Sequence, residues 1–190
     1  MEAVENAPSV IPSRTGVWVG IAAITMSFAA YTSAMLVRES AAPDWQHFQL
    51  PSILYWNTLA LLASSATLEM ARRRLVPPVA AQAARSGRAL LAITLVLGLL
   101  FVAGQVAAWR ALAAQGIYLA TGPSASFFYV FTVLHALHLL GGVVGLVVTS
   151  ARVRADAGAR ALAALGSASV YWHFMGALWV YLLAVLTIKM

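Results

Sequence analysis

The sequence contains, at residues 127–142, the apolar stretch FFYVFTVLHALHLLGG, in which His135 and His138 are three residues apart. A second apolar stretch, YWHFMGALW at residues 171–179, contains His173. Both stretches lie in segments of about 20 apolar residues, which is the length that a helix needs to cross a membrane. A histidine surrounded by hydrocarbon requires a hydrogen-bonding partner, a cavity or a protein interface, so these three residues indicate structural or functional contacts.

The composition is that of an integral membrane protein. Of the 190 residues, 62% are hydrophobic and only 9% are charged. The chain has no cysteine, which excludes disulfides, thiolate metal ligands and cysteine nucleophiles. The formal net charge of +6 comes from arginines in short loops between apolar segments, so it predicts membrane orientation and not binding to nucleic acid.

The hydropathy pattern predicts an all-α fold, a single bundle of five transmembrane helices formed by residues 16–190. The expected spans are residues 16–37, 51–71, 89–109, 125–149 and 170–188. Residues 1–15 are expected to form a short solvated arm, because they have no basic region ahead of an apolar core and so do not resemble a signal peptide.

The basic residues predict how the bundle is oriented. Nine of the twelve lie on one side of the expected membrane, and the other three are Arg38, Arg110 and Lys189. Because cytoplasmic loops are enriched in Lys and Arg, we expect the N-terminus inside and, after five crossings, the C-terminus outside. Aromatic residues near the span ends are expected to anchor at the membrane surface, namely Trp18, Tyr55, Trp56, Trp109, Tyr171 and Trp172.

The histidine pair allows two interpretations. His135 and His138 face roughly one side of a helix and could ligate haem or a metal, or could form hydrogen bonds to a neighbouring helix or subunit. We favour the second interpretation. At about 1.5 Å per residue, His138 and His173 are expected to differ by about 10 Å in depth, too far to bind one iron from opposite faces. His47, in a predicted loop, is expected at the membrane surface.

Other polar residues predict contacts between helices. Glu69 is the only acidic residue in an expected span. Arg72 and Arg73 lie three and four residues on, so we expect these arginines to neutralise it as ion pairs; the alternative is a proton-uptake carboxylate. Gln105 is expected to bond to another helix. Small and hydroxylated residues predict packing faces, at Asn57-Thr58, at residues 64–67 and at Gly141, Gly142 and Gly145.

These features, in this order, resemble subunit III of the haem-copper oxidases, the family of cytochrome c oxidases and quinol oxidases. The resemblance runs from the first span to the last and matches the short, five-helix form. It is carried by GVW at 16–18, WNT at 56–58, LLASSAT at 61–67, Gly104-Gln105 with Trp109, FF at 127–128, the histidine pair with Gly141-Gly142, and YWHF at 171–174 with Trp179.

The resemblance implies an accessory subunit without a redox centre, in a proton-pumping terminal oxidase of the aerobic respiratory chain. Haem and copper are then expected in partner subunits I and II, and this chain is expected to pack on subunit I, stabilise it during turnover and bind membrane phospholipid. It also implies a multi-pass protein of the bacterial inner (plasma) membrane. The resemblance does not distinguish cytochrome c from quinol as the electron donor. It also leaves open the haem type and any contact with further respiratory complexes.

Three positions depart from the family pattern. Similar proteins carry carboxylates in the first, third and last helices where this chain has Ile24, Ala108 and Gly176. Roles of those carboxylates in proton handling or lipid contact therefore do not carry over to this chain. Competing interpretations are a small membrane cytochrome b that uses His135 or His138, and a nitric-oxide-reductase-associated relative. A transporter or channel is a further alternative, although the chain lacks the repeated halves and the charged pathway residues typical of such proteins.

Overall fold

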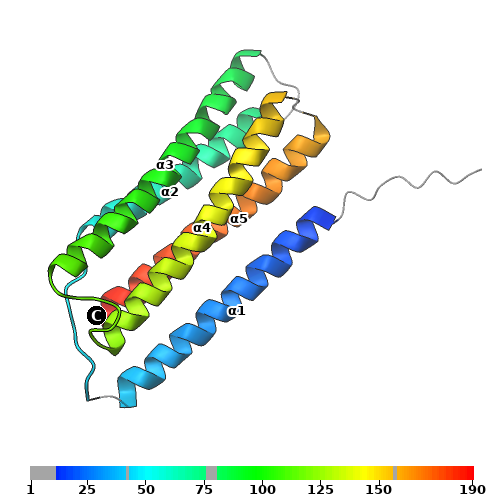
Figure 1. The fold of residues 1–190 in the computed structure, drawn as a ribbon. Helices are drawn as coiled ribbons and strands as arrows, with labels where there is room; N and C mark the ends of the chain where they lie inside the picture. The colour runs from blue at the N-terminus through cyan, green and yellow to red at the C-terminus, as the bar shows by residue number, and fades with distance from the viewer. Residues whose placement is uncertain (1–11, 42, 76–80, 156–157) are drawn as a thin grey trace, which may run out of the picture.

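The computed structural model describes residues 12–41, 43–75, 81–155 and 158–190. This part of the chain forms five helices and no strands, as predicted (Figure 1). The helices are α1 (Pro12–Ala41), α2 (Ile53–Leu75), α3 (Ala81–Ala114), α4 (Pro123–Ala155) and α5 (Ala159–Lys189). Most of the expected arm, residues 1–11, lies outside the described residues, and the rest of it forms the first turn of α1.

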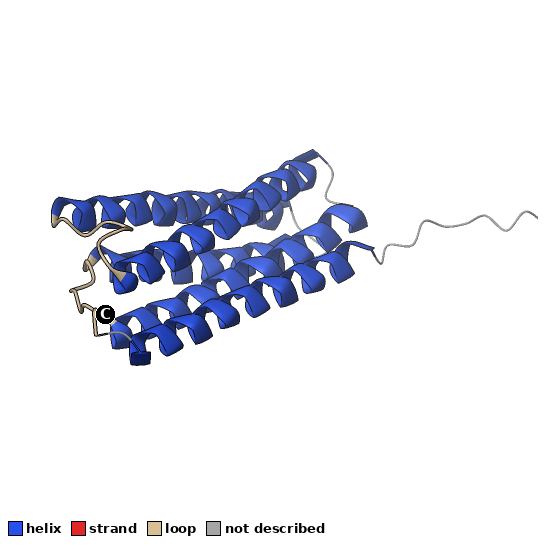
Figure 2. Ribbon diagram, turned by 60° about the horizontal axis from the view of Figure 1, so that its bottom comes forward, coloured by secondary structure: helices blue, strands red, loops and turns tan. Residues whose placement is uncertain are grey.

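Helices α2 to α5 form a four-helix bundle, and α1 packs along one edge of it against α4 and α5 (Figures 1 and 2). The side of α1 that meets the bundle is a stripe of residues spaced three or four apart, which is the helical repeat. The buried residues of this stripe are Ile21, Ile24, Phe28, Thr32 and Met35. Much of the opposite side of α1, including Trp18 and Met26, is exposed and suits contact with lipid.

The connection from α1 to α2 covers the end of the bundle where the C-terminus lies (Figure 1). The Trp45 indole N–H donates to the carbonyl oxygen of Lys189 at 3.0 Å, and the Phe48 amide donates to that of Met190 at 2.9 Å. A Lys189–Glu39 ion pair at 2.9 Å joins the last helix to α1. Trp45 and Phe48 also pack on α4, so one short connection ties three helices together.

Four helices, α1, α3, α4 and α5, are long and apolar enough to cross a membrane. Helix α2 is shorter and less apolar, because it carries the polar residues Asn57, Thr58, Ser64 and Thr67 and ends in three arginines. Its span at residues 51–71 therefore stays a prediction. The helices also extend beyond the predicted spans: α5 begins at Ala159, whereas the span was predicted from residue 170.

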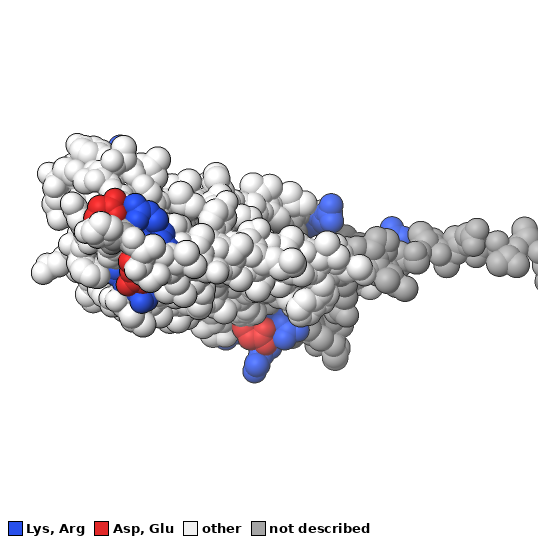
Figure 3. Space-filling model, turned by 90° about the horizontal axis from the view of Figure 1, so that it is seen from below, with Lys and Arg blue, Asp and Glu red and all other residues white. Residues whose placement is uncertain are grey.

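Charged side chains gather at the two ends of the bundle and leave an uncharged band between them (Figure 3). The C-terminal end carries Arg38, paired with Asp44 at 3.0 Å, together with Arg110 and Lys189. The opposite end, called here the arginine-rich end, carries Arg72, Arg73, Arg74, Arg85, Arg88, Arg152, Arg154 and Arg160. This distribution is the basis of the predicted orientation.

Single cysteines at Gln82 and Gln115, in an otherwise cysteine-free chain, should react with an impermeant thiol reagent from opposite sides of the membrane. Both glutamines are exposed, and they lie near opposite ends of α3. We expect Gln115→Cys to be labelled in intact cells and Gln82→Cys only after the membrane is opened, because the arginine-rich end is predicted to be cytoplasmic. The reverse order would invert the predicted orientation.

Candidate functional site

The polar side chains of α2 form hydrogen bonds to the other helices of the bundle. Ser64 accepts from the Trp172 indole at 2.9 Å, and Thr58 accepts from the Trp179 indole at 2.9 Å. Thr67 bonds to Thr94 of α3 at 2.9 Å. Interhelical bonds of this kind contribute about 0.6–2 kcal/mol each in membranes. The predicted packing face of α2 is therefore confirmed, and its polar groups form hydrogen bonds inside the bundle.

Trp172 is not a surface anchor, and that prediction is wrong. Its side chain is completely buried, because α5 begins well before the predicted span and so places Trp172 deep in the bundle. Its ring lies directly on the backbone of Gly98 in α3, where an added Cβ would be 2.7 Å from the ring. Gly142 of α4 gives similar close access to Tyr171 and Trp172.

His135 lies inside the bundle. It is 0% exposed, and its ring packs against Phe101 at 5.8 Å and Trp179 at 5.1 Å between ring centroids. The predicted hydrogen bond from His135 to a neighbouring helix is not found, because neither ring nitrogen has a hydrogen-bond partner among the described residues. The aromatic rings on either side also separate His135 from the surface of the chain.

His138 lies at the edge of the bundle beside α1. The ring is half-buried, with Phe28 of α1 edge-on at a centroid distance of 6.0 Å. Nδ1 lies 2.7 Å from the carbonyl oxygen of Leu134, and because a carbonyl only accepts, Nδ1–H is the donor. In the neutral ring Nε2 is then an acceptor, and it forms no hydrogen bond to another residue in the described part of the chain.

The predicted difference in depth between His138 and His173 is wrong. The hydroxyl of Tyr171 donates to the carbonyl oxygen of His138 at 2.9 Å, so the two histidines lie at similar levels. The error has the same cause as for Trp172, namely the early start of α5. No group of three or more His, Asp or Glu side chains that could hold a metal occurs among residues 12–41, 43–75, 81–155 and 158–190.

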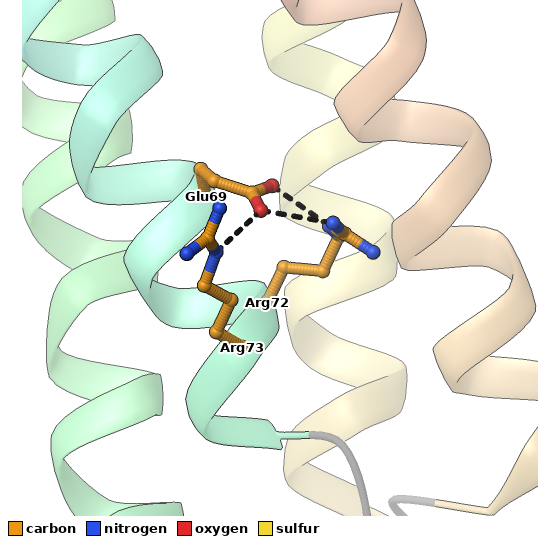
Figure 4. A network of polar contacts seen from close by, with 3 residues as sticks. All are labelled: Glu69, Arg72 and Arg73. Carbon is orange, nitrogen blue, oxygen red and sulfur yellow. Dashed lines mark hydrogen bonds and ion pairs between the residues drawn. The ribbon is translucent and has the colours of Figure 1, made fainter.

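Glu69 forms the predicted ion pairs, with both Arg72 and Arg73 (Figure 4). Its carboxylate accepts from Arg73 Nε at 2.8 Å, and from Arg72 Nε at 2.8 Å and Nη2 at 2.9 Å. The carboxylate is about one-quarter exposed, at the arginine-rich end of α2. Both oxygens are therefore engaged by guanidinium groups, an arrangement that favours a structural ion pair over a proton-uptake group.

The positions that lack the family carboxylates are occupied by packed residues. Ile24 and Ala108 are buried at 8% and 0% exposure. Gly176 lies against α2, where an added Cβ would be 3.3 Å from the Ser65 hydroxyl oxygen. At Ala108 and Gly176 this packing leaves little room for a carboxylate side chain.

The predicted glycine face of α4 is only partly confirmed. Gly142 packs on Tyr171, but Gly141 and Gly145 have no atoms of the described residues within 4 Å of an added Cβ. Sequence reasoning also missed the bond from Trp109 to Thr132, at 3.0 Å between α3 and α4. The one feature of the sequence that could have indicated this hydrogen bond is a threonine in an otherwise apolar, aromatic-rich stretch.

Comparison with known proteins gives the same family as the motifs. Residues 22–189 match the family model described as cytochrome c oxidase subunit III. A probable cytochrome c oxidase subunit 3 of Mycobacterium tuberculosis is 31% identical over 95% of this chain and 89% of its own. The cytochrome c oxidase subunit 3 of Thermostichus vulcanus is 30% identical over 85% of this chain and 77% of its own length. A cytochrome bo(3) ubiquinol oxidase subunit 3 of Pseudomonas aeruginosa is 27% identical over 87% of this chain and 79% of its own length. The chain belongs to the cytochrome c oxidase subunit III family and is an accessory subunit of a haem-copper oxidase.

Proposed function

We propose that this chain is subunit III of a proton-pumping cytochrome c oxidase, which packs on catalytic subunit I and prolongs its activity without a redox centre of its own. The observation that supports this proposal is that polar side chains inside the bundle form hydrogen bonds between helices of the same chain. Side chains such as Ser64, Thr67 and Trp179 bond to other helices of the same chain. A rigid bundle of this kind suits a supporting role, with haem and copper held by subunits I and II.

Co-purification tests this proposal. An affinity tag on the chain should recover subunits I and II with haem and copper in constant ratio to the tagged subunit from membranes in mild detergent. After the subunits are separated, the haem absorbance should stay with subunit I. Haem recovered with the isolated chain would instead support the alternative of a small cytochrome b.

Cytochrome c is the proposed electron donor, and quinol is the second candidate. The family description and the relatives at 30–31% identity carry the name cytochrome c oxidase, whereas the relative at 27% is a ubiquinol oxidase subunit. The purified complex should oxidise reduced cytochrome c much faster than a quinol. The opposite preference would assign the chain to the quinol oxidases, and nitric oxide reduction without oxygen reduction would assign it to the nitric-oxide-reductase relatives.

The proposed site of attachment to subunit I is the outer face of α4, formed by His138, Gly141 and Gly145. The two glycines leave open space in which a partner helix can approach closely. The free Nε2 acceptor of His138, one helical turn away, can receive a hydrogen bond from that helix. The exposed apolar surface of α1 is the proposed contact for phospholipids of the bacterial plasma membrane.

Replacing His138 with leucine should weaken attachment more than catalysis. Loss of one interhelical hydrogen bond, about 0.6–2 kcal/mol, corresponds to about a 3- to 30-fold weaker association of the subunit. Subunit retention and initial oxygen consumption per haem should be measured on the same detergent-solubilised preparation.

The matched control is His47→Leu, which removes an exposed histidine from the α1–α2 connection. It should leave both retention and turnover unchanged. Should His138→Leu collapse the initial turnover while the subunit stays fully bound, His138 would have a direct role in catalysis or proton transfer, contrary to the proposal.

A further inference from the structure

Two fully buried polar side chains in the bundle have nitrogen atoms without a hydrogen-bond partner among the described residues. Gln105 on α3 and His135 on α4 are both 0% exposed. Within the described part of the chain, the amide nitrogen of Gln105 and both ring nitrogens of His135 form no hydrogen bond. A buried donor or acceptor left unpaired is strongly unfavourable, most of all where the surroundings are hydrocarbon. These atoms therefore indicate a missing polar partner.

Contacts on either side place Gln105 and His135 at one level of the bundle. Phe101 packs edge-on against His135, at 5.8 Å between ring centroids. Further along α3, Trp109 donates to Thr132 at 3.0 Å. Gln105 is one helical turn from both Phe101 and Trp109, and α3 and α4 run in opposite directions. Gln105 is thus on the side of α3 that faces α4, at the level of Thr132 and His135.

A third polar side chain reaches the same level from α2. Asn57 is 5% exposed, and its Nδ2 donates to Gln105 Oε1 at 3.5 Å, the long limit of a hydrogen bond. The Asn57 carboxamide lies on the backbone of Gly104, where any Cβ would collide with it. An asparagine, a glutamine and a histidine from three helices therefore lie at one level inside the bundle, here called the polar layer.

The chemistry of these groups defines what can complete their bonding. The Gln105 amide offers two N–H donors, and a neutral imidazole offers one donor and one acceptor. A shared ligand must therefore accept from the amide and also exchange a hydrogen bond with the ring. It must be small, because the rings of Phe101 and Trp179 pack closely on His135. A cation does not fit, since the amide N–H groups would repel it.

We propose that an internal water molecule binds in the polar layer, where it accepts a hydrogen bond from the Gln105 amide and bonds to the His135 imidazole. Water meets all the requirements above, and buried waters characteristically bridge polar groups that cannot reach one another directly. The bound water joins α3 to α4 and, through Asn57, to α2. It thereby fixes the register of these helices in the half of the bundle nearer the C-terminus.

Solid-state NMR on the assembled complex in phosphatidylcholine–phosphatidylglycerol vesicles tests the proposal. With isotopically labelled histidine and backbone assignment of the wild-type chain, magnetisation should pass from a water proton to the ring nitrogens of His135. No variant is needed for this result. A His135 ring that receives no transfer from water, or that couples directly to the Gln105 amide, would overturn the proposal.

Variants give a second readout. Gln105→Leu should abolish the transfer from water to His135, because leucine fills the space of the amide without offering a hydrogen bond. Gln115→Leu is the matched control, one residue beyond the end of α3: Gln115 is exposed and donates to the carbonyl oxygen of Ala111. The control should leave the transfer unchanged. Persistence of the full signal in Gln105→Leu would show that the water is not bound by Gln105.

Melting of the complex tests whether the two residues share one ligand. Gln105→Leu and His135→Leu should each lower the melting midpoint of the subunit by about 2–10 °C. The double variant should lose less than the sum of the two shifts, because the second substitution removes a group that the first has already left unpaired. Strictly additive shifts would contradict a shared water.

Discussion

Replacing Gly98 with valine should leave little correctly folded subunit. Trp172 occupies the space where the new side chain would lie, with ring atoms at 2.7 and 2.9 Å from the position of a Cβ. The ring cannot move away easily, because it is completely buried and its N–H is held by Ser64. Overpacking of a close-packed core costs about 1–3 kcal/mol, and here it also endangers an interhelical hydrogen bond of about 0.6–2 kcal/mol.

The amount of subunit recovered with the complex and its melting midpoint measure this effect. We expect a midpoint lowered by about 3–20 °C, at about 2–4 °C per kcal/mol for a chain of this size. Gly20→Val is the matched control, because a Cβ at Gly20 meets no described atom within 4 Å. A Gly98→Val subunit as stable as this control would mean that α3 and α5 do not approach each other as described.

Replacing Trp179 with alanine should have an effect of similar size through the opposite change, the loss of packing. Trp179 is fully buried, packs edge-on against Phe101 at 4.9 Å and lies 5.1 Å from the His135 ring. Its indole also donates to Thr58. Truncation of a buried tryptophan costs about 3–5 kcal/mol, so the melting midpoint should fall by about 6–20 °C.

Trp56→Ala provides the control for tryptophan removal, because Trp56 is 70% exposed on α2. It should shift the midpoint by no more than about 2 °C. Equal shifts for the two variants would show that Trp179 does not lie at the centre of the bundle.

Much of the helical framework could be predicted from the sequence, because the physical signals are local. Long apolar segments predict helices in lipid, and the Glu69–Arg73 spacing predicts an ion pair within one helix. The hydroxylated residues of α2 also correctly indicated a packing face, since polar groups in an apolar helix need partners. In each case the pattern lies within a single element of the chain.

The errors concern where helices begin and which side chains meet across helices. The predicted span at residues 170–188 was limited by membrane thickness, but α5 continues back to Ala159. That difference moved Trp172 from the surface to the core and brought His138 level with His173. The pairs Ser64–Trp172 and Thr58–Trp179 are more than 100 residues apart in sequence, and no local pattern identifies which tryptophan meets which hydroxyl.

The polar layer shows the same limit for the candidate site. Asn57, Gln105 and His135 were each singled out as intramembrane polar residues, but their convergence depends on the relative register of three helices. That register follows from packing, in particular from the contact of Asn57 with Gly104. His138, which looks equivalent to His135 in sequence, lies at the bundle edge because a position three residues on is rotated by about 60° around α4 from that of the buried His135.

The central claim, that this chain is a non-catalytic subunit that sustains a haem-copper oxidase, is tested most directly by oxygen consumption of the complex with and without the chain. Enzyme from a strain that lacks the chain should start at nearly the same turnover per haem as the complete complex. It should then lose activity after fewer total turnovers, and adding back the purified chain should restore the longer lifetime. An initial rate close to zero without the chain, or an unchanged lifetime, would contradict the account.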